Sequence, residues 1–238
     1  SSPVIVLEQS SIEQSSAATV TKGDRVWHVD DFAATPLLTP QVTFHQTGPL
    51  ATHTAVMFPT TAVEEPLPIV MDPYGGPHAQ RVIKSRNAFL VSQWLADQGF
   101  CVVVTDGPGT PGRGDGWERI VRGDLAEPTL QAQVDALFAI GEIYQERVDL
   151  SRVGIRGWSF GGYLAALAVL RRPDVFHAGV AGAPVTDWLL YDTHYTERYL
   201  GHPDEEPENY ERTLLTIVDD DQKRPLMLIR GLADDNVV

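Results

Sequence analysis

Residues 157–162 of this chain read Gly-Trp-Ser-Phe-Gly-Gly, a G-x-S-x-G pattern, and this stretch governs the interpretation of the segments around it. The residues before it, 153–156, form a short and mainly apolar run that is typical of a buried strand. The residues after it, 163–170, are strong helix formers. The pattern therefore lies where G-x-S-x-G carries chemical meaning, at a sharp turn from a strand into a helix.

A turn this tight predicts a strained backbone at Ser159, which needs very small neighbours, and Gly157 and Gly161 supply them. The turn would lift the Ser159 hydroxyl above the sheet and place it at a helix N-terminus, where unpaired N–H groups favour developing negative charge. We interpret Ser159 as a candidate nucleophile. The alternative is a glycine-rich helix start with a capping serine, and the motif alone does not separate the two.

Length and composition restrict the class of protein. A chain of 238 residues suits one large α/β domain, alone or with a small appendage. A net charge of -14 at pH 7 repels phosphate backbones and anionic lipid, which argues against nucleic acid and membrane surfaces as partners. The single cysteine, Cys101, lies in an apolar run and is interpreted as a buried core thiol. No zinc-type spacing of Cys and His is present, no cofactor is implied, and the single cysteine favours a cytoplasmic location.

Residues 1–45 show β character but hold too few apolar residues to bury a core of their own. We interpret them as a β-rich remnant of an N-terminal domain with a linker, and residues 46–238 as a second domain in which apolar strands alternate with helices. Strands are expected at 54–58, 68–71, 100–105, 153–156, 177–181 and 225–230, and helices at 87–98, 128–146, 163–170, 187–200 and 210–218. This alternation predicts an α/β fold with a mostly parallel sheet and helices on both faces.

Catalytic groups of such sheets lie on loops at the carboxyl ends of strands, and in α/β hydrolases they follow the chain order Ser, then Asp or Glu, then His. The loop after residues 225–230 offers Asp234, which we interpret as the carboxylate that would orient a histidine. The aspartates in this loop could instead form a turn or a weak calcium site. Calcium, however, needs six or more oxygens, and few are nearby.

A histidine is missing from the place that this order requires. All seven histidines precede Asp234. His78, in the loop of residues 72–78, is a minor candidate that would break the expected order. We therefore expect the sequence to stop before the loop that carries the base, and the 238 residues on their own to hydrolyse nothing.

Two donors are expected to bind a developing oxyanion. One is the backbone N–H of Phe160, directly after the nucleophile. The other is Tyr74 in the loop of residues 72–78, because a phenol with a usual pKa of about 10 stays protonated at neutral pH. The two glycines after Tyr74 would let a substrate carbonyl approach closely. The alternative is an ordinary turn with an incidental tyrosine.

An aromatic stripe follows the strand beside the nucleophile strand. Its members recur at helical spacing along residues 187–200, and they are Trp188, Tyr191, Tyr195 and Tyr199. Such a stripe usually packs into a core. Here it lies where a substrate pocket would form, and aromatic walls suit a compact apolar side chain. The glycine-rich loop of residues 106–114 lacks G-K-[ST] and contains two prolines, so we do not interpret it as a phosphate site.

These motifs together resemble the catalytic domain of the prolyl oligopeptidase family of serine peptidases, and most closely its dipeptidyl peptidase IV branch. The matching segments are residues 72–78, 157–163, 191–199 and 231–237, within a similarity that runs from about residue 42 to the end. The resemblance implies an α/β-hydrolase fold. It also implies that residues 1–45 are the last strands of a β-propeller with its linker, and that residues 46–238 are a catalytic domain truncated before the triad histidine.

Roles for single residues follow from the resemblance. Ser159 would be the nucleophile, Asp234 the triad acid and Tyr74 the oxyanion donor. The pocket for the residue before the scissile bond, typically proline or alanine, would be lined by Val185, Trp188, Tyr191 and Tyr195. Asn236 would hold a substrate carbonyl near the amino end of the peptide. Substrates would be peptides with a free N-terminus, and the full-length protein would be a homodimer.

Two departures from the family pattern leave alternatives open. The triad histidine and the acidic pair of the propeller, which binds the free amino group, are absent from these 238 residues. Phe160 replaces the tyrosine that is common after the nucleophile, which we expect to be harmless because only its backbone is used. An acylaminoacyl peptidase, an oligopeptidase or a carboxylesterase of the same fold therefore stays possible, as does a non-catalytic homologue.

Overall fold

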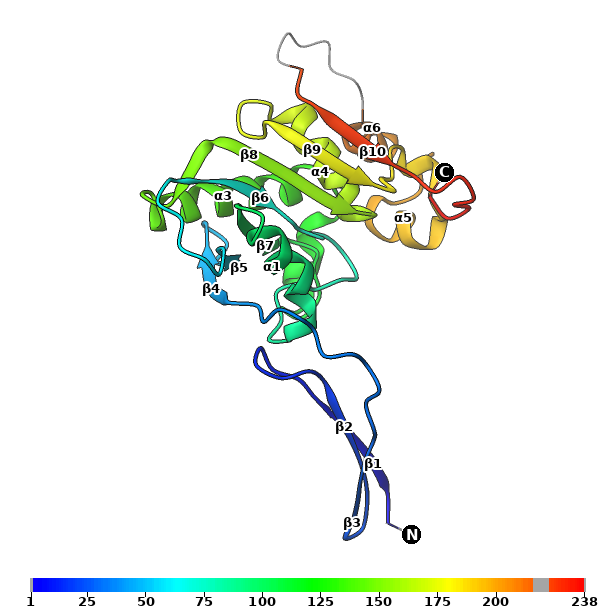
Figure 1. Cartoon of the computed structure of the whole chain (residues 1–238). Helices are drawn as coiled ribbons and strands as arrows, with labels where there is room; N and C mark the ends of the chain where they lie inside the picture. The colour runs from blue at the N-terminus through cyan, green and yellow to red at the C-terminus, as the bar shows by residue number, and fades with distance from the viewer. Residues whose placement is uncertain (1, 216–222, 238) are drawn as a thin grey trace.

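Two sheets of different size organise the chain, for which the computed structural model describes residues 2–215 and 223–237. The smaller sheet is antiparallel and has the order β1 (Val4–Gln9), β2 (Ala17–Lys22) and β3 (Arg25–His28). In Figure 1 it extends away from the body that holds the larger sheet. The β character predicted for the first residues is therefore present.

The larger sheet has seven strands in the order β10-β9-β8-β6-β7-β5-β4. In chain order these strands are β4 (Val42–Thr47), β5 (Thr52–Met57), β6 (Leu67–Met71), β7 (Cys101–Asp106), β8 (Val148–Trp158), β9 (Ala178–Gly182) and β10 (Leu226–Ile229). The pairs from β7 through β6, β8 and β9 to β10 are parallel, whereas β4 and β5 run antiparallel to their neighbours. The mostly parallel α/β sheet predicted from the alternation of strands and helices is confirmed.

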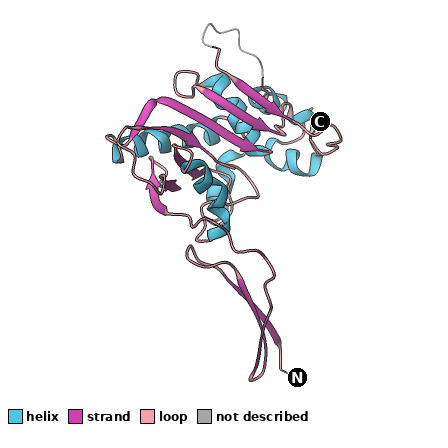
Figure 2. Cartoon of the chain, in the orientation of Figure 1, coloured by secondary structure: helices cyan, strands magenta, loops and turns pink. Residues whose placement is uncertain are grey.

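Helices cover both faces of this sheet, as Figure 2 shows. They are η1 (Arg86–Phe89), α1 (Leu90–Ala96), α2 (Asp115–Glu118), η2 (Arg119–Val121), α3 (Glu127–Ile143), α4 (Phe160–Arg171), η3 (Trp188–Leu190), α5 (Thr193–Leu200) and α6 (Pro207–Thr213). Strand β7 contacts helices on both faces of the sheet. Its residues Val102 and Val104 pack with Ala96 of α1, while Cys101 and Val103 belong to the cluster that includes α3 and α4. All six residues of β7 are buried, which is why its sequence does not alternate.

The helix predicted over residues 187–200 is wrong as a single element. The structure divides it into η3 and α5, because Tyr191 between them is extended, with φ -98° and ψ 167°. Two aspartates cause the division. Asp187 accepts a hydrogen bond from the Leu189 N–H at 2.9 Å, and Asp192 accepts one from the Tyr195 N–H at 2.9 Å, so each starts a new helix. The four aromatic residues therefore do not form the face of one helix.

Other differences are smaller. β4 and the short α2 were not anticipated, because neither has a clear periodic pattern. The helix expected at 210–218 begins earlier, as α6 (Pro207–Thr213), with proline in its first turn. Residues 216–218 of that prediction lie outside the described residues.

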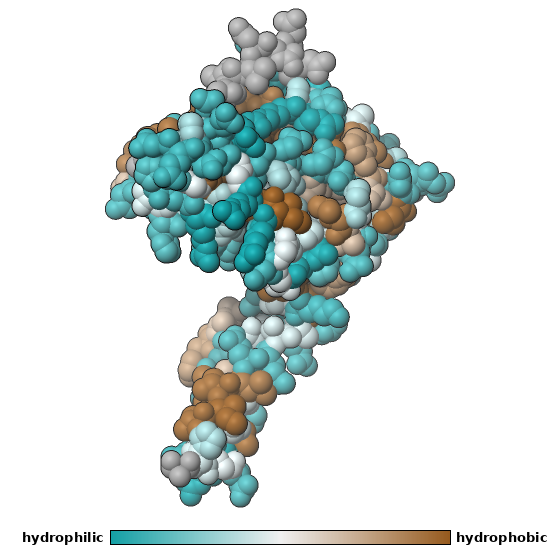
Figure 3. Space-filling model, turned by 180° about the vertical axis from the view of Figure 1, so that it is seen from behind, coloured by the Kyte–Doolittle hydropathy of each residue, from teal (hydrophilic) through white to brown (hydrophobic). Residues whose placement is uncertain are grey.

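The small sheet exposes apolar side chains on both of its faces. Ile5 is 57% exposed and its neighbour Val6 is 67% exposed, although successive side chains of a strand point to opposite faces. Figure 3 shows hydrophobic residues gathered on this part of the molecule. These strands therefore bury no core of their own, in line with the low apolar content of the segment. In the described ranges we find no helix with the length and apolar character needed to cross a membrane.

Candidate active site

The turn at Ser159 has the strained geometry that the motif predicts. Ser159 has φ 56° and ψ -120°, a conformation that non-glycine residues rarely adopt, and α4 begins directly after it. The turn is held because the Ser159 N–H donates to the Gly182 carbonyl at 2.9 Å and the Ser159 carbonyl accepts from the Tyr163 N–H at 2.9 Å. A Cβ at Gly157 would overlap the Gly161 carbonyl oxygen, so Gly157 is required there.

The start of α4 packs directly against the loop that carries Tyr74. A Cβ added at Gly161 would lie 2.5 Å from the carbonyl oxygen of Pro73, and one added at Gly76 would overlap the Phe160 ring. Glycine at both positions therefore lets the loop after β6 approach the turn after β8. The Tyr74 and Phe160 rings lie 6.0 Å apart.

Tyr74 is partly buried beside Ser159. Burial raises the pKa of the Tyr74 phenol, and a hydrogen bond with the Ser159 side chain acts in the opposite direction. A raised pKa keeps the phenol protonated at neutral pH, so it can donate a hydrogen bond. The structure thus brings together the two residues that the sequence predicted as nucleophile and oxyanion donor.

Two buried aspartates fix the ends of the Tyr74 loop. Asp72 is 3% exposed, accepts a hydrogen bond from Ser92 Oγ at 2.9 Å, and pairs with Arg81 at 3.2 Å and Arg156 at 3.6 Å. Asp106 accepts the backbone N–H of Arg81 at 2.9 Å, and burial raises the pKa of its carboxyl. The sequence patterns did not predict that these two aspartates hold the loop. Their position at the ends of strands was the signal that could have indicated it.

The aromatic residues form a packed group next to the turn. The Trp188 and Tyr195 rings are stacked, 5.8 Å apart and 7° from parallel. The Tyr191 ring stands nearly perpendicular to both, at 5.8 Å from Trp188 and 5.4 Å from Tyr195. Phe160 reaches the same group, with its ring 5.9 Å from Trp188. Val185, which precedes η3, is buried in the core cluster that contains Trp188.

Tyr195 of this group lies in a desolvated environment. Burial raises the pKa of Tyr195, and Tyr74 is the tyrosine that adds most to this effect. The aromatic group and the Tyr74 loop are therefore neighbours in space, although more than a hundred residues separate them in the sequence.

The loop that carries Asp234 leaves the same edge of the sheet. Gly182 pairs with Trp158 on one side and with Ile229 on the other, so β8, β9 and β10 end side by side. Asp234 closes its own loop by accepting the N–H groups of Asn236 at 3.2 Å and Val237 at 3.0 Å. The turn that the sequence offered as an alternative is thus present. Among the described residues, no cluster of carboxylates, cysteines and histidines suited to a metal ion is found.

Asn236 connects this loop to the aromatic group. Its Nδ2 lies 3.5 Å from the Tyr191 hydroxyl, a long hydrogen bond. The loop after β10 therefore meets the aromatic group through Tyr191. That group in turn contacts Phe160, whose ring lies beside the Tyr74 ring.

The histidines are placed elsewhere. All seven belong to the described part of the chain, and none is hydrogen-bonded to Ser159 or Asp234. His78, the minor candidate, has its Nε2 2.9 Å from the Tyr199 hydroxyl. The observed geometry therefore gives no histidine in contact with the candidate nucleophile.

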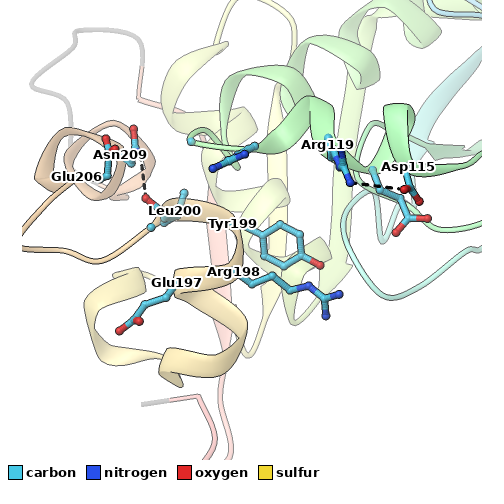
Figure 4. Close-up of a pocket in the computed structure, with 12 residues that line it drawn as sticks. Asp115, Arg119, Glu197, Arg198, Tyr199, Leu200, Glu206 and Asn209 are labelled. Carbon is cyan, nitrogen blue, oxygen red and sulfur yellow. Dashed lines mark hydrogen bonds and ion pairs between the residues drawn. The ribbon is translucent and has the colours of Figure 1, made fainter.

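A charged hollow of about 860 Å³ lies next to Tyr199, between α5 and the segment of α2 and η2. Figure 4 shows Arg119 and Arg198 on its walls, with Arg119 paired to Asp115. Its lining includes Tyr199 but not Ser159, Tyr74 or Asp234. The hollow is therefore a neighbour of the candidate site and not the site itself.

A family model described as the prolyl oligopeptidase family matches residues 87–238, which is more than half of the chain. The chain belongs to this family. The match includes Ser159 and Asp234 and begins after Tyr74. The resemblance stated from the motifs is confirmed.

Individual relatives agree with this assignment. Dipeptidyl peptidase 8 from Mus musculus is 40% identical over 178 residues, which cover 71% of this chain and 20% of that protein. The protein of the same name from Homo sapiens is also 40% identical and is covered to 19%. The crystal structure of Porphyromonas gingivalis dipeptidyl peptidase 4 has a TM-score of 0.84 and 28% identity, and the alignment covers 100% of this chain and 36% of that one. The chain thus spans about a fifth of the curated relatives that it matches.

Proposed function

We propose that this chain is the catalytic domain of a serine peptidase that releases dipeptides from the N-termini of peptides. The packing of the Tyr74 loop against the turn at Ser159, at the carboxyl end of the parallel sheet, supports this most directly. Asp234 follows β10 at the same edge of the sheet. The similar proteins named as dipeptidyl peptidases support the reaction class.

In the proposed reaction, Ser159 Oγ attacks the carbonyl carbon of the second peptide bond. The carbonyl electrons move to oxygen, and the oxyanion accepts hydrogen bonds from the Phe160 N–H and the Tyr74 phenol. Collapse of this intermediate expels the amine of the shortened peptide, which takes up a proton, and leaves an acyl group on Ser159. Water then attacks this ester and releases the dipeptide with a free carboxylate.

The aromatic group suggests the side chain that precedes the scissile bond. The half-buried Tyr191 and Tyr195 offer flat, largely apolar walls, with the buried Trp188 stacked on Tyr195 and Val185 in the same core cluster. Such walls suit a compact apolar side chain such as proline or alanine. We propose that Asn236 holds the preceding carbonyl, and that groups outside this chain bind the free amino terminus.

The proton of Ser159 must go to a base. No histidine of the described chain lies against Ser159, and His78 is hydrogen-bonded to Tyr199 instead. We propose that the base comes from outside these 238 residues and that Asp234 orients it. The isolated 238-residue chain should then give no turnover, so measurable hydrolysis by that chain would contradict this part of the proposal.

The test compares chromogenic X-Pro substrates with a free amino group against the same substrates with a blocked one, on the full-length protein. We expect hydrolysis of the free substrates, its loss in Ser159→Ala, and a fall in kcat of about 100- to 1000-fold in Tyr74→Phe. Activity on blocked peptides alone would favour an acylaminoacyl peptidase or an oligopeptidase. Activity on esters alone would favour a carboxylesterase, and no activity would favour a non-catalytic homologue.

Two parts of the proposal concern the whole protein. We propose that residues 1–45 are the last strands and linker of an N-terminal propeller, that residues 46–238 form the catalytic domain, and that the full-length protein is a homodimer. The exposed apolar side chains of β1 support the first part, because such strands need further strands to cover them. Sedimentation of the full-length protein at micromolar concentration would measure the assembly, and a monomer there would exclude the dimer.

A further inference from the structure

His78 makes a hydrogen bond that has no role in the proposed reaction. It belongs to the loop that carries Tyr74, and its Nε2 lies 2.9 Å from the hydroxyl of Tyr199 on α5. Its ring also packs against the Tyr195 ring, with centroids 5.0 Å apart. One side chain of the Tyr74 loop therefore contacts two residues of α5.

The backbone at His78 indicates that this contact is maintained against strain. His78 has φ 73°, in the left-handed region that side chains other than glycine seldom adopt. Such a conformation persists where the surrounding contacts hold it in place, and it is frequent near functional sites. The Tyr199 hydroxyl and the Tyr195 ring are the contacts that hold His78 in this structure.

The contact with α5 adds a third point at which the loop is held. Asp72 and Asp106 fix the two ends of the loop, and Gly75 and Gly76 in its middle lie against Leu164 and Phe160 of α4. The contact with α5 is made four residues after Tyr74. It also joins the loop to the aromatic group, because Tyr195 is stacked on Trp188.

We propose that His78 and Tyr199 are positioning residues, whose hydrogen bond holds the Tyr74 phenol in register with Ser159 and with the aromatic group. The proposal rests on the function proposed above, and adds two residues to it. His78 is no base in this arrangement, since its hydrogen bond to Tyr199 directs it to α5. The effect is expected on kcat, because Tyr74 acts on the oxyanion, which exists only after the attack.

The experiment uses the full-length protein and a free X-Pro substrate. His78→Phe keeps a ring against Tyr195 and removes the nitrogen, and Tyr199→Phe removes the hydroxyl without touching the strained backbone. Each should lower kcat roughly three- to tenfold, as expected for the loss of one hydrogen bond between side chains, and leave KM within about twofold. The double variant should be no slower than the slower single variant, because both remove the same bond.

Two further variants separate positioning from general stability. In a Tyr74→Phe background, His78→Phe should change kcat by less than about twofold, since the residue through which it acts is gone. The matched control is Tyr144→Phe. It removes another His–Tyr hydrogen bond, in which the Tyr144 hydroxyl lies 2.9 Å from His45 Nε2, and it should leave kcat unchanged.

The outcomes are distinguishable. Unchanged kcat in both His78→Phe and Tyr199→Phe, or multiplied effects in the double variant, would overturn the positioning role while the peptidase proposal stands. A His78→Phe effect that persists in the Tyr74→Phe background would also overturn it. A parent protein without activity on any peptide would overturn the proposed function and this inference together.

Discussion

Single residues decide whether the turn at Ser159 can form. The conformation of Ser159 is possible because its neighbours carry no side chain where the backbone crosses itself. Gly157 faces the Gly161 carbonyl, Gly161 faces Pro73, and Gly162 faces the Gly182 carbonyl. Three glycines thus bring α4 against a strand, a loop and the next strand at once. A methyl group added at any of the three would lower the stability of the fold, because the atoms that it would meet belong to the backbone and cannot move away.

We expect Gly157→Ala to lower the free energy of unfolding of the chain by about 1–3 kcal/mol or more, because the new Cβ meets backbone and not a flexible side chain. Urea unfolding followed by tryptophan fluorescence measures this. The matched control is Gly116→Ala in α2, where a Cβ would meet nothing within 4 Å. That variant should keep or slightly raise stability, as alanine favours a helix. Equal effects of the two substitutions would argue against the steric explanation.

The Cys101 thiol should make stability depend on pH in the alkaline range. Burial raises its pKa from 9.0 to about 12. Below pH 9 the thiol is protonated in both states. Above pH 9 the unfolded chain loses this proton while the folded chain keeps it, so the free energy of unfolding falls as the pH rises toward 12.

We expect Cys101 to contribute a loss of about 1–1.5 kcal/mol between pH 8 and pH 10. The measurement is urea unfolding of the parent and of Cys101→Ala at both pH values. The variant starts less stable because a buried side chain is shortened, but its fall between the two pH values should be smaller. Tyrosines titrate in both proteins and cancel in the comparison. Identical slopes would show that the buried thiol does not cause the effect.

At the scale of elements, capping overrides periodicity between β9 and α6. The spacing of the aromatic residues predicts one helix, yet Asp187 and Asp192 each accept an N–H group that a continuous helix would use otherwise. The resulting break at Tyr191 turns its ring perpendicular to those of Trp188 and Tyr195. Side chains from two short helices can therefore surround a space that one helix face would only border.

We expect Asp192→Ala to destabilise α5 by about 0.5–2 kcal/mol, because the N–H of Tyr195 loses its acceptor. Since α5 carries Tyr195 and Tyr199, amide hydrogen exchange along residues 193–200 should speed up before the rest of the chain is affected. Asp192→Asn is the matched control, as asparagine caps equally well without the charge. If both variants behaved like the parent, the cap would contribute nothing to α5.

At the scale of the whole molecule, local sequence patterns predicted the sheet but did not predict the contacts between segments that are distant in the sequence. The buried strands, the glycine turn and Asp234 at a strand end can be found from neighbouring residues, because each depends on local composition. The pairing of Asp72 with Arg156 joins residues far apart, and no periodicity marks which charged side chains will meet. The hydrogen bond of His78 to Tyr199 is hidden for the same reason.

The division of the chain into two structural parts leads to a further expectation. Few contacts join the small sheet to the larger one. The Arg86 N–H donates to the Ser11 carbonyl at 2.8 Å, and Ile12 packs at the edge of the cluster that includes α1. Gln41, which donates its N–H to Gln93 Oε1 at 2.8 Å, already belongs to the larger body.

A chain that begins at residue 38 should therefore unfold in a single cooperative transition, with a free energy of unfolding lower by only about 1–3 kcal/mol, the worth of a few hydrogen bonds and one partly buried side chain. Urea unfolding measured by circular dichroism and by fluorescence tests both statements. Ile12→Ala in the uncut chain is the companion variant, and it should reproduce part of the loss because it weakens the same contact with the small sheet left in place. A truncated chain with a broad transition, or with different midpoints for the two probes, would contradict this expectation. It would mean that β1–β3 form one cooperative unit with the seven-stranded sheet, and that they contribute more than the energy of their few contacts with it.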